Sequence, residues 1–491
     1  MKKVILCGTH PEQFNGYSKV VFELARHIAG CTDIKLHIFG FQNFYDKPDH
    51  KLERKLPENV EVYDVYANEN PKNKGFGENL ICDYITSIKP HVVIVYNDLV
   101  VINSLLNKIK EIPVIDFRIV PYIDIVYQNE KNSLIANINM ICDAAIMFTP
   151  YWKQIINYQG FKKPTYVVEH GFNKDVFYPI PKKLARKFYN IKEDDFVLIN
   201  LNRNQPRKRW DICIMAFVKF VASHMNDPIK LMIATNMNGG WDLAEVIISE
   251  CRKYGVEVAE FQKHIIMLQN PQQITDFEIN AMYNVGDVGI NTCDGEGFGL
   301  CNFEQAGVGK AQIVPNIGGF KSVFRKNENS LVIDPKWSYY CDHGRDFVGG
   351  EPEVCDVDDF VDALEFYYIN RDVMHAHGQQ ARKDILSKYS WDQMGQKLYT
   401  AIATEYGFLK EKEDAIVTAT MSEDSSILKP VDLSDLLDNT SSPASNAPIC
   451  INGADEDGTL EIVEGSGPGK DLDAMNPDEM RELLKKMLHK N

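Results

Sequence analysis

The sequence predicts an α/β protein made of two consecutive doubly wound domains, each with a parallel sheet covered by helices on both faces. Short apolar runs alternate with helical patterns along most of the chain, which is the pattern of strand, helix, strand repeats. A charged, proline-containing stretch at residues 178–192 divides these repeats into two series. The length of 491 residues also favours more than one domain, because a single domain usually holds about 100 to 200 residues.

The first domain is expected over residues 1–180. Its expected strands are residues 3–8, 34–41, 60–66, 91–97, 113–119, 144–148 and 165–169. The run FVLINLN then opens a second series, and we expect the second domain over residues 190–375. Its expected strands are residues 196–202, 229–235, 264–268, 288–292, 312–315 and 331–333, and two of its expected helices are residues 209–223 and 243–254.

The end of the chain has a different composition. Residues 411–475 are polar, acidic and rich in turn residues, so we expect a disordered tail that cannot bury enough apolar area to fold. Residues 476–491 are an exception, because they start with a proline and carry apolar side chains along one helical face. Two interpretations stay open for that short amphipathic helix, a docking site for a partner or an unbound terminus.

Charge and cysteine content exclude several classes of protein. The formal net charge is -16, of which residues 411–491 contribute -11 (18 acidic and 7 basic residues), so the remainder carries only -5 and binding of nucleic acid through bulk charge is not expected. The 11 cysteines are scattered and form no metal-ligand spacing, which is typical of reduced thiols. No apolar run has the length of a membrane span or a signal peptide, so we expect a cytoplasmic protein without a transmembrane segment.

The strongest chemical signal is the segment NTCDGEGFGLCNFEQAGVGK at residues 291–310. An expected strand runs into a glycine-rich turn and then into a helix, whose first amides and dipole form a site for a diphosphate. Glu296 lies in the turn and Glu304 lies eight residues later, at most about 12 Å away along the helix. A carboxylate accepts two hydroxyl hydrogen bonds, so Glu304 suits a ribose and Glu296 suits a transferred sugar. An ordinary strand-to-helix connection with solvated glutamates explains the same residues.

Two further segments carry candidate binding residues. In LNRNQPRKRWD, residues 201–211, basic side chains cluster where a strand ends and a helix begins, and Arg203 with Lys208 would place two cations on one diphosphate. A solvated basic loop is the alternative there. Gly16 lies in the loop after the first strand, where the absence of a Cβ lets a phosphate or sugar approach the backbone, or simply permits a turn.

Together these segments resemble the family 4 retaining glycosyltransferases of the GT-B fold, also called glycosyl transferases group 1, over roughly residues 1–408. Glu296 and Glu304 match the family's E-x7-E pattern with its EGFGL core, Arg203 and Lys208 match its R-x4-K pair, and Gly16 matches its first-loop glycine. The segment HGFNKDVFYP is similar to the family's interdomain segment, and YSWDQMGQKL is similar to its closing helix.

The resemblance implies two Rossmann-like domains facing a cleft, with residues 376–409 as closing helices that cross back to the first domain. It also implies a nucleotide-diphosphate sugar as donor substrate, retention of the anomeric configuration, and no metal or other cofactor. The resemblance assigns Glu296, Arg203 and Lys208 to catalysis. It assigns substrate binding to Gly16, Glu304 and the turn residues Gly297, Phe298, Gly299 and Leu300. The base, the sugar and the acceptor, whether glycan, lipid or protein, are not determined by the sequence.

One feature departs from the family pattern. Many members carry a histidine just after the strand that corresponds to PVIDF here, and this chain has none. We take Asp116, Arg118 and Asp124 as candidates for the first-domain group that contacts the sugar. His170 lies where the family usually has asparagine, and we expect it to be a hydrogen-bonded loop residue.

Three other functions fit the same fold. A sugar-nucleotide epimerase and a polymerising enzyme similar to glycogen synthase would share both domains and the donor site. A non-catalytic nucleotide-sugar-binding protein is a different class, and it is disfavoured because all four charged donor-site positions are filled in this sequence.

Overall fold

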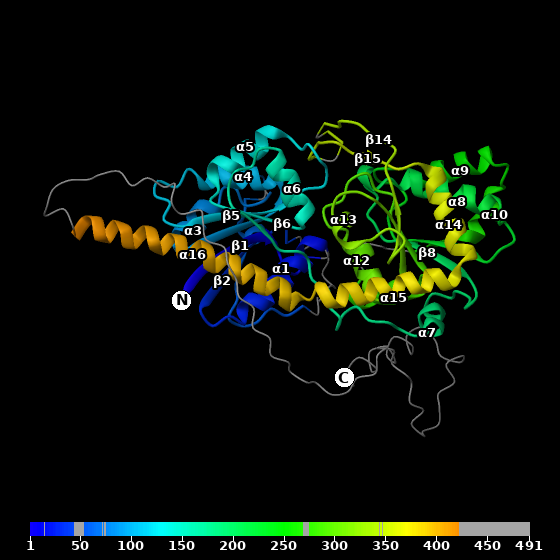
Figure 1. Ribbon diagram of the computed structural model, residues 1–491, viewed down its shortest axis with the longest axis horizontal. Coiled ribbons are helices and arrows are strands. Elements are labelled where there is room, and N and C mark those ends of the chain that lie inside the picture. Colours follow the sequence, from blue (N-terminus) through cyan, green and yellow to red (C-terminus); the bar gives the residue numbers. More distant parts are fainter. Residues whose placement is uncertain are drawn as a thin grey trace, which may run out of the picture.

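A computed structural model describes residues 1–421, apart from residues 14, 44–53, 71, 73–74, 269–273, 343 and 346, and the side chains of residues 412–421. It has two Rossmann-like domains side by side, as Figure 1 shows, and the predicted fold class is confirmed. Most of the expected tail, together with the expected helix at residues 476–491, lies outside the described residues. The backbone of residues 411–421 is helical, so the last described helix extends beyond the expected start of the tail.

The first domain is built on a sheet of seven parallel strands in the order β3-β2-β1-β4-β5-β6-β7. The strands are β1 (Lys2–Thr9), β2 (Ile34–Phe41), β3 (Glu61–Asp64), β4 (Val92–Asp98), β5 (Arg118–Asp124), β6 (Ala145–Met147) and β7 (Thr165–Val167). The helices are α1 (Gly16–Ala29), α2 (Val65–Asn68), α3 (Ile81–Ile88), α4 (Leu99–Ile109), α5 (Asn132–Ile141) and α6 (Pro150–Tyr158). The order of the strands reverses between β1 and β4, so ligands are expected beyond the carboxyl ends of these two strands.

The second domain repeats this plan with six parallel strands in the order β10-β9-β8-β11-β12-β13. The strands are β8 (Phe196–Asn200), β9 (Ile229–Ile233), β10 (Ile265–Met267), β11 (Val288–Ile290), β12 (Ala311–Pro315) and β13 (Leu331–Ile333). The helices up to β13 are α7 (Lys182–Phe188), α8 (Trp210–Ala222), α9 (Leu243–Lys253), α10 (Val258–Phe261), α11 (Asp276–Val285), α12 (Leu300–Gly307) and α13 (Phe320–Val323). The strand order reverses between β8 and β11.

The remaining elements complete the second domain and return to the first. A two-stranded antiparallel ribbon, β14 (Trp337–Ser338) with β15 (Glu353–Val354), precedes α14 (Val357–Ile369). Helix α15 (Arg371–Lys388) packs on α12 and β12, and α16 (Trp391–Met421) then runs over α1 and the strands β4 and β5 of the first domain (Figure 1). The segment that divides the two series of repeats holds α7, which packs on α11 of the second domain.

One expected strand is wrong. Residues 113–119 were expected as the fifth strand, but β5 is Arg118–Asp124, and Val114 is 72% exposed. The error comes from Pro121, which lacks a backbone N–H and therefore argues against a strand interior. Here it is tolerated because β6 pairs only with Tyr122 and Ile123, so that at Pro121 the strand has β4 alone as its partner. The correction moves the carboxyl end of the strand, and with it the site, to Asp124.

Helix α16 is fixed to the first domain by a buried carboxylate. Glu405 is fully buried and accepts a hydrogen bond from Nε of Arg118 at 2.8 Å and one from the hydroxyl of Tyr166 at 2.7 Å. Arg118 stands at the amino end of β5 and also pairs with Asp143 at 3.0 Å. A buried carboxylate is stable only when charged and polar partners compensate it, so this cluster sets the position of the helix on the sheet.

We therefore expect Glu405→Ala to lower the free energy of unfolding by about 3 kcal/mol, because the substitution removes the buried carboxylate that pairs with the half-buried Arg118 and accepts from Tyr166. The midpoint of urea-induced unfolding, followed by circular dichroism, measures this loss. Glu411→Ala is the matched control, since Glu411 lies on the same helix and is exposed. Equal midpoints for the two variants would contradict the structural role of Glu405.

Candidate functional site

The second domain places its two candidate motifs beside each other at the reversal of the strand order. The basic segment follows the carboxyl end of β8, and the glycine-rich turn follows the carboxyl end of β11. These strands are neighbours in the sheet, with Val288 paired to Leu198, so the two segments lie on adjacent loops. A ligand bound at this edge would contact both motifs.

The glycine-rich turn presents the start of α12 without any side-chain cap. Gly299 precedes the helix with a φ of 87°, a left-handed conformation that favours glycine, and no side chain accepts a hydrogen bond from the first amides of α12. The first helical bond runs from the amide of Phe303 to the carbonyl of Gly299 at 3.0 Å. The amides of residues 300–302 therefore remain available for an anion.

The first domain lies directly against this turn. A Cβ on Gly297 would lie 2.0 Å from Oδ1 of Asp124, and one on Gly295 would lie 2.2 Å from a ring carbon of Tyr127. The carbonyl of Gly297 accepts a hydrogen bond from the indole of Trp152 at 2.7 Å. Only residues without a side chain fit at these two positions, so the glycines serve contact between the domains as well as backbone exposure.

Gly16 lies opposite the start of α12. A Cβ on Gly16 would come within 3.1 Å of a methyl group of Leu300, so the first turns of α1 and α12 meet across the cleft. The start of α1 is capped by its own side chains. The side chain of Asn15 accepts from the amide of Ser18 at 2.8 Å, and the hydroxyl of Ser18 accepts from the amide of Asn15. Gly16 therefore offers close approach to a ligand, whereas the free amides belong to α12.

Glu296 and Lys208 form a buried ion pair within the second domain. Lys208 ends the 3-10 turn Pro206–Lys208, and its ammonium contacts Oε2 of Glu296. Burial alone would raise the pKa of Glu296, but Lys208, then Arg207 and Arg203, outweigh burial and hold that pKa below its usual value. Glu296 is thus kept ionised beside three cations, which is the environment expected at a site for a negatively charged ligand.

The four basic residues of the segment 201–211 divide into two groups. Arg203 is exposed, and its guanidinium makes no hydrogen bond or ion pair with any described residue. Arg207 lies close enough to Glu296 and Asp124 for their charges to raise its pKa against the effect of burial. Arg209 instead bonds Asp211, with a shortest distance of 2.7 Å. Arg203, Arg207 and Lys208 therefore face the site, whereas Arg209 stabilises the loop through its bond to Asp211.

Glu304 is held from both domains. Its Oε1 accepts from the ammonium of Lys19 of α1 at 2.7 Å, and its Oε2 accepts from the hydroxyl of Tyr283 of α11 at 2.9 Å. Burial raises the pKa of Glu304, and Lys19 opposes this shift without cancelling it. The sequence provided no signal for Lys19, which lies 285 residues from its partner.

Asp124 is the first-domain carboxylate of the site. The hydroxyl of Tyr17 donates to its Oδ2 at 2.5 Å, while its Oδ1 is buried, has no hydrogen-bond partner among the described residues and faces Gly297. Burial raises the pKa of Asp124 to about 6, although Tyr17 and Arg207 oppose the shift. The other two candidates are wrong, because Asp116 is exposed and Arg118 pairs with Glu405 at the opposite end of β5.

His170 is buried among aromatic rings rather than hydrogen bonded in a loop. Neither ring nitrogen has a hydrogen-bond partner within the described chain, which contradicts the sequence-based expectation. Its ring lies 4.4 Å from that of Phe148 and 4.7 Å from that of Phe298, measured between centroids. Burial lowers the pKa of His170 to about 3, so the imidazole is neutral. Its ring packs against that of Phe298 in the glycine-rich turn.

The described residues lack two other features, a metal site and a membrane-spanning helix. They contain no group of three or more histidine, cysteine, aspartate or glutamate side chains that could hold a metal ion. No helix among them has both the length and the apolar character needed to cross a bilayer.

Comparisons with known proteins agree with this geometry. Residues 181–340 match the family model Glycosyl transferases group 1. The chain is 24% identical over 169 residues to the D-inositol 3-phosphate glycosyltransferase of Thermobispora bispora, and this match spans 34% of the chain and 38% of that protein. The chain thus matches less than half the length of such curated relatives.

Two solved structures share the fold over most of the chain. Sucrose-phosphate synthase from Thermosynechococcus elongatus superposes with a TM-score of 0.63 at 13% identity, covering 83% of this chain and 100% of that one. Anabaena HepE in complex with UDP and glucose superposes with a TM-score of 0.60 at 12% identity, covering 82% of this chain and 100% of that one. The likeness of these structures confirms the predicted GT-B architecture.

Asp124 makes the stability of the cleft depend on pH. Its folded-state pKa of about 6 lies above the ordinary aspartate value of 3.8, so rising pH between about 4 and 6 destabilises the parent relative to Asp124→Asn. We expect the free energy of unfolding of the variant to gain about 2 kcal/mol on the parent between pH 4 and pH 7. Urea unfolding at both pH values measures the gain, with the exposed Asp194→Asn as control. A difference that does not change with pH would contradict the assignment.

Proposed function

We propose that the chain, whose residues 181–340 match the Glycosyl transferases group 1 model, transfers a hexose-type sugar from a nucleotide-diphosphate sugar to a hydroxyl acceptor with retention of configuration. The observation that carries this proposal is the meeting of three cations, the uncapped start of α12 and two buried glutamates at one sheet edge. A diphosphate flanked by a ribose and a sugar has matching charges and hydroxyl groups. Neighbours of this fold solved with UDP and glucose make UDP-glucose the first donor to test.

The diphosphate is assigned to Lys208, Arg203 and the amides of residues 300–302. Cations and backbone amides fixed before the reaction stabilise the negative charge that grows on the leaving phosphate. Lys208 already contacts Glu296, so its ammonium is fixed in position and lies in a site from which water is largely excluded. Arg203 has no other partner among the described residues, and a ligand phosphate would satisfy its guanidinium.

The two glutamates are assigned to the two sugars of the donor. Glu304 accepts from Lys19 and Tyr283, and a carboxylate has about four lone-pair directions, so ribose hydroxyls can still bond to it or displace Lys19. Glu296 lies in the turn beside Asp124 of the first domain and orients the transferred sugar. Asp124 lies on the first-domain side of the turn, with its Oδ1 buried against Gly297. In this scheme a donor phosphate oxygen accepts the proton of the acceptor hydroxyl.

Substitution of Glu304 should mainly lower the affinity for the donor, whereas substitution of Lys208 should mainly lower kcat. Glu304→Ala removes a charged acceptor of ribose hydrogen bonds, each contributing about 1.5 to 3 kcal/mol, so donor affinity should fall at least tenfold. Lys208→Ala removes a cation whose interaction strengthens in the transition state, so kcat should fall more than donor affinity. Titration calorimetry with UDP-glucose, or the donor identified in its place, and initial rates separate the two effects.

Each of these substitutions has a matched control. Glu328→Ala and Lys183→Ala remove exposed residues of the same charge from the same domain. Glu304→Gln and Lys208→Arg preserve size or charge, so they separate loss of function from loss of folding if an alanine variant unfolds. Folded Glu304→Ala and Lys208→Ala proteins that bind donor and turn over like the parent would overturn the assignment of the site.

A chelator should leave the transfer rate within about twofold of its starting value, because Lys208 and Arg203 supply the charge that a metal supplies in other transferases. Initial rates before and after treatment with EDTA, followed by dialysis, measure this. Loss of activity with EDTA and recovery with magnesium or manganese would show that a metal holds the diphosphate.

A further inference from the structure

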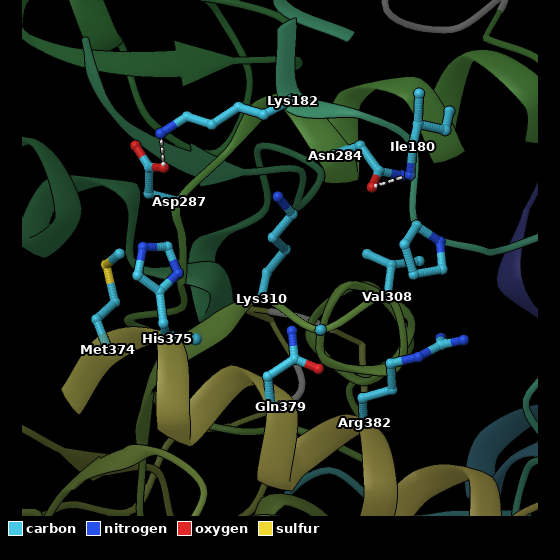
Figure 2. A pocket seen from close by; sticks show the side chains of 13 residues that line it. Ile180, Lys182, Asn284, Asp287, Val308, Lys310, Met374, His375, Gln379 and Arg382 are labelled. Carbon is cyan, nitrogen blue, oxygen red and sulfur yellow. Dashed lines mark hydrogen bonds and ion pairs between the residues drawn. The ribbon is translucent and has the colours of Figure 1, made fainter. Parts of the chain in front are cut away.

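A second pocket lies at the opposite end of the second sheet from the cleft. It has a volume of about 140 Å³ and lies beside Asp287 and Lys310, which precede β11 and β12, whereas the cleft lies beyond the carboxyl ends of β8 and β11. A cavity of about 150 Å³ holds benzene in another protein, so a small ion or metabolite fits here. Four separate segments wall the pocket: the chain between the domains at residues 179–182, residues 284–287 before β11, residues 308–311 after α12, and α15 (Figure 2). We call it the connector pocket.

The charges of the connector pocket are unbalanced in favour of cations. Its one carboxylate, Asp287, bonds Lys182 at 2.9 Å and Arg186 at 2.7 Å and accepts from the amide of Val197 at 2.9 Å. The single negative charge of Asp287 is therefore compensated by two positive charges. Arg382 stands at the rim and donates to the carbonyl of Gly307, which leaves most of its guanidinium hydrogens uncommitted.

Lys310 is the cation without a partner. Its ammonium forms no hydrogen bond or ion pair with any described residue, and Figure 2 shows the side chain rising into the open space between Asp287 and Asn284. Burial lowers the pKa of Lys310 to about 8, and the charges of Lys182 and Arg186 act in the same direction against Asp287. An ammonium in such surroundings is costly unless an anion accompanies it.

We propose that the connector pocket binds a phosphate group, either as inorganic phosphate or as the phosphate of a small monoester, between Lys310 and Lys182. A tetrahedral phosphate dianion has several acceptor oxygens and two negative charges, so it can accept hydrogen bonds from both ammonium groups at once. Asp287 does not repel it strongly, because Lys182 and Arg186 compensate that carboxylate. His375, also in the pocket wall, has its pKa lowered by burial and contributes charge only in acid.

A phosphate bound here would join the connector, α12 and α15. The amide of Val308 in the pocket wall bonds the carbonyl of Glu304 at 3.1 Å, so the pocket lies one helical turn from the residue proposed to bind the ribose. The connector and the α15 to α16 junction are the two places where the chain passes between the domains. The pocket is thus placed to couple an anion to domain movement, and its existence does not rest on the proposed transfer reaction.

The test follows acetylation of Lys310 by an N-hydroxysuccinimide ester, quantified by peptide mass spectrometry at pH 8 and constant ionic strength. Inorganic phosphate should slow labelling of Lys310 at least tenfold at saturation, while labelling of the exposed Lys183 stays unchanged. Glycerol 3-phosphate that protects at lower concentration than phosphate would identify a monoester as the ligand. UDP should not protect Lys310, which separates this pocket from the cleft.

Two variants locate the anion. Lys182→Met should raise the half-protecting phosphate concentration at least tenfold, and Asp287 keeps Arg186 as its partner in this variant. Lys183→Met removes the same charge one residue away and should leave protection unchanged. The proposal is overturned if Lys310 does not react even without phosphate, if neither phosphate compound slows its labelling, or if Lys182→Met protects like the parent.

Discussion

The contact between the glycine-rich turn and the first domain is the constraint on which the cleft depends. At Gly295 and Gly297 any side chain would occupy the space already filled by Tyr127 and Asp124. The same close approach buries one oxygen of Asp124 and lets Trp152 bond the turn carbonyl, so both domains define the position of the first amides of α12. Closure, burial of the first-domain carboxylate and orientation of the anion site therefore have one steric cause.

The cleft can bury its charged side chains because an opposite charge on the protein compensates each glutamate of the site. Lys208 compensates Glu296 inside one domain, whereas Lys19 compensates Glu304 from the other. The second pair exists only while the domains are together, and it uses the carboxylate that we assign to the ribose. Lys19 and the ribose hydroxyls thus use the same oxygens of Glu304, so the affinity for the donor depends on how strongly Lys19 holds the two domains together. Preorganised charges of this kind are also those that stabilise a transition state without reorganisation.

Local sequence patterns locate the two motifs that the structure brings together at the edge of the second sheet, but they do not locate the first-domain residues that face them. The glycine turn with its two glutamates, and the basic segment with Lys208, are each read from about ten consecutive residues at a strand end. Asp124 is one of three candidates in the sequence, and what separates it from the other two is that β5 continues through Pro121 and ends at Asp124. Lys19 carried no signal at all, because its significance comes from a residue in the other domain.

The two ends of α12 show why one helix can serve two sites. Its carboxyl end carries the negative pole of the helix dipole, and there the guanidinium of Arg382 bonds the carbonyl of Gly307, so the chain neutralises that pole itself. Its amino end has Gly299 in place of a capping side chain, so the positive pole is compensated only by an anion from outside. A serine or aspartate at Gly299 would cap the amides but would also collide with Phe320, 2.1 Å from the added Cβ. The packing that closes the turn therefore keeps the anion site open.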